Sequence, residues 1–80
     1  MEFSHIIGRN VRSFRKLRGM TQQQLSKKSG LNRAYIGYVE RGEKNLSIDT
    51  IVAIAKALEI KPHFLWMEDV DEAFNKFIYR

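Results

Sequence analysis

Four residues between positions 33 and 38 have the types and spacing that suit contacts to the edges of base pairs. Arg33, Ala34, Gly37 and Tyr38 recur at intervals of three and four residues, which places them on one face of a helix. Arginine donates to guanine edges or to phosphates, and apolar groups contact thymine methyl groups. A short helix fits the major groove of duplex DNA with its N-terminal residues nearest to the bases. The pattern therefore predicts a surface that reads DNA.

Two short capped helices must position this surface. Thr21 and Gln24 fit a capping box that begins a helix running to about Ser29, and Gly30 ends it. Asn32 caps the next helix, which runs from Arg33 to about Arg41 and closes at Gly42. The apolar positions of the segment are spaced to pack the two helices at a steep angle: Leu25, Leu31, Ile36 and Val39.

The remaining segments also have helical periodicity, and no stretch alternates long enough to form a strand. We expect a first helix over residues 4–18, and a fourth that Ser47 caps, with one apolar face comprising Ile48, Ile51, Ile54/Ala55 and Leu58. Pro62 suits the first position of a short fifth helix. Asp69 and Glu72 fit the cap of a final helix. The prediction is a single all-α domain, residues 1–80, of five or six helices.

Charge is divided unevenly along the chain. Residues 1–45 carry ten Lys and Arg against three acids, a net of +7, whereas residues 46–80 carry four against six, a net of −2. The first half therefore suits a polyanion and the second does not. The chain has no cysteine and no signal-peptide pattern, and its longest apolar run is far too short to span a bilayer, so we expect a cytoplasmic protein without a membrane partner.

The motif resembles the Cro/phage-repressor-type (XRE-type) helix-turn-helix family over about residues 7–66. Matching stretches include Ile7–Arg12, Gly19–Gln22, Leu25-Ser26, Gly30-Leu31 and Val39–Gly42. The run from Leu31 to Ser47 is also similar to controller proteins of bacterial restriction–modification systems. Two positions depart from the family pattern: Ser26 replaces the usual alanine, and Gly37 lies inside the recognition helix. Gly37 either removes a base contact or lets the backbone approach DNA.

The resemblance implies a compact lambda-repressor-like fold and a role for each matching residue. Arg33, Ala34, Gly37 and Tyr38 would face the bases. Arg15 and Glu40 would form a structural ion pair between the first and third helices. Gln22 would contact a phosphate and buttress the recognition helix. Further contacts to the flanking phosphates would come from a larger set: Asn32, Tyr35, Arg41, Lys44 and Asn45.

The C-terminal part of the chain, about residues 61–80, is unusually rich in large apolar side chains. Eighty residues enclose little interior for so many aromatic groups, so we expect this part to contribute to a homodimer interface. The predicted interface residues are Phe64, Leu65, Trp66, Phe74, Phe77 and Ile78. A twofold dimer would select a pseudo-palindromic operator on double-stranded DNA, and two dimers could bind adjacent sites cooperatively.

The pattern favours a transcription regulator, most similar to a controller protein that acts as activator and repressor, over three alternatives. A phage or plasmid repressor of the same fold differs only in its operator and genes. An antitoxin would also bind a toxin protein. An enzyme is least favoured, because no nucleophile and base are arranged for catalysis. His5 and His63 lack partners at metal-ligand spacing, so no metal site, cofactor or small-molecule effector is predicted.

Overall fold

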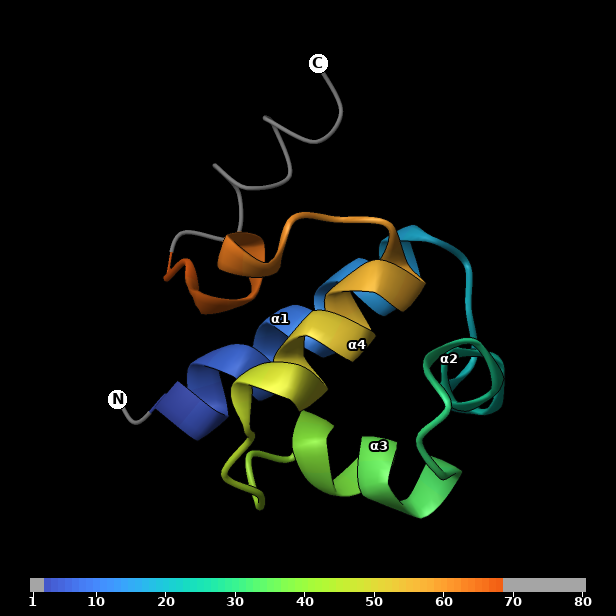
Figure 1. Ribbon diagram of the computed structural model, residues 1–80, viewed down its shortest axis with the longest axis horizontal. Coiled ribbons are helices and arrows are strands. Elements are labelled where there is room, and N and C mark those ends of the chain that lie inside the picture. The colour runs from blue at the N-terminus through green and yellow to red at the C-terminus, as the bar shows by residue number, and fades with distance from the viewer. Residues whose placement is uncertain (1–2, 69–80) are drawn as a thin grey trace.

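The computed structural model describes residues 3–68 of the 80-residue chain (Figure 1). This part contains four α-helices and one 3-10 helix, and no strand. The elements are α1 (Phe3–Leu17), α2 (Gln22–Ser29), α3 (Arg33–Glu40), α4 (Ile48–Leu58) and η1 (Pro62–Trp66). The all-α class is confirmed. The expected count of five or six helices is not confirmed, and the final helix predicted at Asp69 and Glu72 lies outside the described residues.

Local signals begin and end these helices as predicted. The Thr21 hydroxyl accepts from the Gln24 amide at 3.1 Å, and the Thr21 amide donates to Gln24 Oε1 at 2.8 Å, which completes the capping box. Asn32 Oδ1 and Ser47 Oγ accept from the amides of Tyr35 and Thr50 in the same way. Gly30 closes α2 with a φ of 78°, a left-handed conformation that glycine adopts without strain.

The end of α4 was not predicted, because Glu59 rather than glycine occupies the left-handed cap, with a φ of 58°. The Arg18 side chain lies against this turn. Its Nε donates to the Leu58 carbonyl at 2.8 Å and its Nη2 donates to the Glu59 carbonyl at 2.9 Å. These bonds satisfy carbonyl groups that the end of the helix leaves without intrahelical donors. The charged bonds help to offset the strain of a positive φ at a residue with a side chain.

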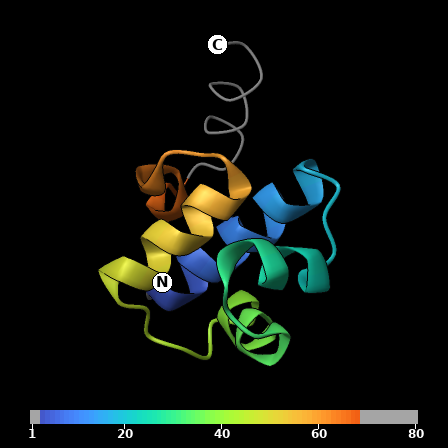
Figure 2. The same ribbon diagram turned by 45° about the vertical axis from the view of Figure 1, so that its right-hand side comes forward.

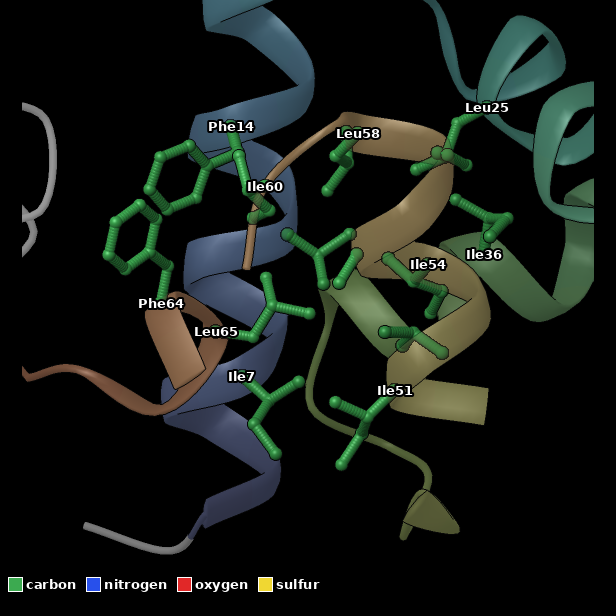
Figure 3. Close-up of a cluster of buried hydrophobic side chains, with 14 residues drawn as sticks. Ile7, Phe14, Leu25, Ile36, Ile51, Ile54, Leu58, Ile60, Phe64 and Leu65 are labelled. Carbon is green, nitrogen blue, oxygen red and sulfur yellow. The ribbon is translucent and has the colours of Figure 1, made fainter. Parts of the chain in front are cut away.

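The helices enclose one core. α1 packs against α3 and η1, while α2 packs against α3 and α4 (Figures 1 and 2). Figure 3 shows buried side chains from all five elements: Phe14 of α1 lies beside Phe64 of η1, and Leu25 and Ile36 lie on the side of α4 that faces α2 and α3. The labelled members, all buried, are Ile7, Phe14, Leu25, Ile36, Ile51, Ile54, Leu58, Ile60, Phe64 and Leu65. None of the helices within residues 3–68 is long and apolar enough to cross a membrane.

Two expectations about apolar side chains were wrong. Phe64 and Leu65, predicted at a dimer interface, are 5% and 0% exposed within the single chain, and Phe64 stacks on Phe14 with ring centroids 6.0 Å apart. Ile48, expected on the apolar face of α4, is 66% exposed. Trp66 is half-buried against the core. Phe74, Phe77 and Ile78 lie outside the described residues.

Candidate nucleic-acid interface

The second and third helices form a rigid pair because their facing side chains are fully buried. Leu25 of α2 and Ile36 of α3 are both completely inaccessible to solvent. In the turn between the helices, Ser26 Oγ donates to the Leu31 carbonyl at 2.5 Å, a bond that the alanine usual at this position in the family could not make. The predicted helix-turn-helix is therefore present, with α3 placed by its contacts to α2.

α1 holds α3 from the other side. A Cβ atom added to Gly8 would overlap the carbonyl oxygen of Val39, so the two helix backbones approach as closely as a glycine permits. The same contact explains why a glycine occupies this buried position of α1, although glycine has a low helix propensity. α3 is thus packed between α1 and α2, which leaves its remaining side free.

The predicted ion pair is present at the C-terminal end of α3. Arg15 Nε lies 2.6 Å from Glu40 Oε2, and Arg15 Nη2 donates to Glu40 Oε1 at 3.0 Å. Gln22 Nε2 donates to the same Oε1 at 3.1 Å, so one carboxylate joins α1, α2 and α3. This contact is the buttress predicted for Gln22. The second hydrogen of its amide group remains able to donate to a phosphate.

The free side of α3 carries three of the four residues predicted to face bases. Arg33, Ala34 and Tyr38 are exposed, with Tyr38 at 42%. Gly37 differs from the expectation, because it is buried. A Cβ atom at Gly37 would meet Arg41 Nη1 at 3.3 Å, so the Arg41 side chain lies over this glycine.

The residues expected to contact flanking phosphates surround this face. Asn32 is at the N-terminal end of α3, and Arg41, Lys44 and Asn45 lie exposed beyond its C-terminal end. Lys44 Nζ is 5.2 Å from the centroid of the Tyr38 ring, and Asn45 Oδ1 accepts from Ser4 Oγ at 3.0 Å. Tyr35 is half-buried and packs against the core, which leaves only part of its side chain available to a phosphate.

Sequence reasoning missed one residue of this surface, Glu43. Arg41 Nε donates to Glu43 Oε2 at 3.1 Å, so an acid lies within the basic rim. The hydrogen bond from Arg41 to Glu43 raises the pKa of Arg41 above its ordinary value. The two residues are only two positions apart, a spacing that a helical pattern does not bring together. The turn at Gly42, with a φ of 74°, makes the contact possible.

Comparisons with known proteins agree with this geometry. A family model described as helix-turn-helix matches residues 11–65. The control protein C.SmaI of Serratia marcescens is 47% identical over 58 residues, which are 72% of this chain and 69% of the relative. The crystal structure of the controller protein C.AhdI from Aeromonas hydrophila is 40% identical with a TM-score of 0.75, covering 78% of this chain and 94% of that one.

A second similar structure contains DNA. The restriction–modification controller protein C.Esp1396I, solved as a tetramer with its natural 35 base-pair operator, is 30% identical with a TM-score of 0.78. The match covers 92% of this chain and 97% of that one. Together with the packed α2–α3 pair, these similarities show that the chain belongs to the Cro/phage-repressor-type (XRE-type) helix-turn-helix family and is similar to restriction–modification controller proteins.

Proposed function

We propose that this chain is a sequence-specific DNA-binding transcription regulator that controls a restriction–modification system. The observation that carries the proposal is the free side of α3, where Arg33, Ala34 and Tyr38 project from a helix fixed by the Arg15–Glu40–Gln22 network. A helix held in this way reaches base edges in the major groove, while its rigid support fixes its angle to the DNA.

Each residue of the surface has a role that follows from its place. Arg33, at the N-terminal end of α3, donates to a guanine or to an adjacent phosphate, and Ala34 and Tyr38 contact base edges. Gly37 contributes little contact area of its own. Phosphates on either side of the groove bind to a larger group of donors: Gln22, Asn32, Tyr35, Arg41, Lys44 and Asn45.

The working unit is a homodimer on a pseudo-palindromic operator. A twofold axis would place two copies of α3 in successive major grooves, about one helical turn of DNA apart. The 35 base-pair operator complex of a similar tetramer supports two dimers on adjacent sites. The part of the chain from about residue 61 to residue 80 contributes to the interface, and Trp66, only half-buried, is the described member of the predicted set that remains available for it.

The chain acts in the cytoplasm and has no catalytic step of its own. The genes that it regulates would be its own gene and a restriction endonuclease gene. It would activate transcription at low operator occupancy and repress its own gene once a second dimer binds. This mode of regulation is what the resemblance to controller proteins implies, and the tetramer on the operator of a similar protein is compatible with a second dimer binding.

Selection of binding sites from random duplex DNA tests the proposal. We expect a palindrome with half-sites about one turn apart, bound by two chains in each complex. The logarithm of the binding constant should fall linearly with the logarithm of the salt concentration, with a slope of about −0.9 for each phosphate contacted. Enrichment of no duplex sequence, or affinity that does not change with salt, contradicts the function.

The genomic positions of the selected operators, and the proteins that copurify with the chain, separate the alternatives. Operators upstream of an endonuclease gene support a controller protein, whereas operators in a prophage or plasmid locus support a repressor of that element. A small toxin protein that copurifies at one-to-one stoichiometry supports an antitoxin. A controller protein is expected to purify with its own chain alone.

A further inference from the structure

The Arg41 side chain lies over the free side of α3 instead of extending beyond the end of the helix. Its guanidinium carbon is 5.0 Å from the centroid of the Tyr38 ring, and its Nη1 lies 3.3 Å from the point that a Cβ on Gly37 would occupy. Residues 33, 37 and 41 form one row along a helix because they are four positions apart. Helical side chains lean toward the N-terminus, so Arg41 covers the position one turn before it.

Gly37 makes this placement possible. A Cβ at position 37 would lie 3.3 Å from Arg41 Nη1, so even alanine would require the guanidinium to shift slightly, and a longer side chain would compete with it for space. Gln22 Oε1, 3.9 Å from the same point, is in ordinary van der Waals contact. Glycine also lowers the stability of a helix interior relative to alanine. Gly37 therefore lowers the stability of α3 but leaves room for the Arg41 guanidinium. This cost is explained if Arg41 makes a contact to DNA from this face.

Glu43 and Tyr38 both contact the guanidinium, which remains exposed to solvent. The Glu43 amide donates to the Tyr38 carbonyl at 2.9 Å, so the turn after α3 folds back and returns the Glu43 carboxylate to the helix. That carboxylate accepts from Arg41 Nε, while the Tyr38 ring lies beside the guanidinium. Among residues 3–68, no side chain or carbonyl accepts from Nη1 or Nη2.

A guanidinium held through Nε and one ring presents its two Nη groups together. Such a pair of parallel donors matches the O6 and N7 acceptors of guanine in the major groove, the commonest specific contact between an arginine and a base. A phosphate contact at the margin would not require this support, since a flexible cation such as Lys44 serves equally well there. The geometry therefore favours a base over a phosphate as the partner of Arg41.

We infer that Arg41 is a second guanine-reading residue in each half-site, positioned by Glu43 and Tyr38 in the space that Gly37 leaves open. This inference rests on the proposed function and replaces the phosphate role that the family resemblance implied for Arg41. The half-site would then contain two guanine contacts, from Arg33 at the start of α3 and from Arg41, which follows the last residue of α3 and lies over Gly37.

Binding of purified full-length variants to every single-base change of the selected operator tests the inference. Arg41→Lys keeps the charge but loses the planar pair of donors, so we expect the preference for one guanine per half-site to fall about tenfold or more, with the salt slope unchanged. Gly37→Ala and Glu43→Gln should weaken the preference at the same base pair, because both disturb the guanidinium without removing it.

Lys44→Ala is the matched control, since Lys44 also lies beside Tyr38 but offers only a point charge. We expect it to weaken binding to all sequences by one factor and to make the salt slope shallower by about one contact. Thermal unfolding of each variant verifies that the fold is retained.

The inference is overturned if Arg41→Lys keeps every base preference, or if Gly37→Ala changes none. Both results would come from a wild-type protein that still selects a palindrome, so they would leave the proposed function standing. A wild-type protein that selects no duplex sequence would instead contradict the proposed function itself.

Discussion

Arg15 and Glu40 form a two-point ion pair that ties the last turn of α1 to the last residue of α3. The side chains are 11% and 4% exposed, so the pair lies largely out of solvent. Arg15 Nη1 also donates to the Met20 carbonyl at 2.9 Å, and Gln22 shares the Glu40 carboxylate. The recognition helix is therefore oriented by charged groups at one end and by apolar packing along its length.

Removal of the Glu40 charge should destabilise the whole fold. In Glu40→Gln, the Arg15 guanidinium remains largely buried without a counter-ion, and we expect the free energy of unfolding to fall by about 3 kcal/mol. Urea denaturation followed by circular dichroism measures the change. Lys28→Ala is the control, because Lys28 and Glu59 are 4.0 Å apart and both exposed, and its effect should stay below about 1 kcal/mol. Equal losses in the two variants would contradict the structural role of the buried pair.

Gly8→Ala should destabilise the protein although alanine is the better helix former. Propensity alone predicts a gain of about 1 kcal/mol in the interior of α1. The added methyl group would overlap the Val39 carbonyl oxygen, however, and the backbone of α3 cannot move without disturbing the core. We expect a net loss of about 2 kcal/mol or more in urea denaturation.

Gly30→Ala is the comparison for Gly8→Ala, because a Cβ at Gly30 meets nothing within 4 Å and only the positive φ is strained. Its loss should be about 1 kcal/mol, the cost of holding an L-residue in the left-handed region. If Gly8→Ala were neutral or stabilising, the close approach of α1 and α3 would be wrong.

Asn10→Asp should release η1 from α1. Asn10 is 1% exposed, and its amide nitrogen lies 2.9 Å from the Leu65 carbonyl and 2.7 Å from the Met67 carbonyl. Aspartate has the same size but no donor when ionised, so its charge would face two carbonyl oxygens. We expect a loss of at least about 2 kcal/mol in the free energy of unfolding. Gln23→Ala, on the exposed face of α2, should have little effect on the same measurement.

Arg33→Ala should weaken binding to the selected operator by about 1–3 kcal/mol and relax the preference at one base pair per half-site. The reason is the position of Arg33 at the first residue of α3, where side chains come nearest to the base edges. Fluorescence anisotropy on the operator and on its single-base variants measures both quantities. An unchanged affinity and an unchanged footprint would refute the assignment.

Features that depend on a few neighbouring residues were predictable from the sequence. The capping box at Thr21, the caps at Asn32 and Ser47 and the glycine stop at Gly30 all formed as expected. These signals act within about one helical turn, so their outcome depends little on the rest of the chain. The Arg15–Glu40 pair was predictable only through the family resemblance, because its members are 25 positions apart.

Tertiary structure alone decided which neighbours cover each side chain. Phe64 and Leu65 were predicted at a dimer interface because the chain has many large apolar residues, yet Phe14 and the rest of the core bury them. Gly37 was expected to be exposed, yet it is buried and the Arg41 side chain lies over it. The turn at Gly42 then brings Glu43 to Arg41, a contact that helical spacing does not describe. The sequence determined where helices begin and which residues are apolar or charged. Burial and pairing depend on contacts between distant segments, and only the packed chain brings those segments together.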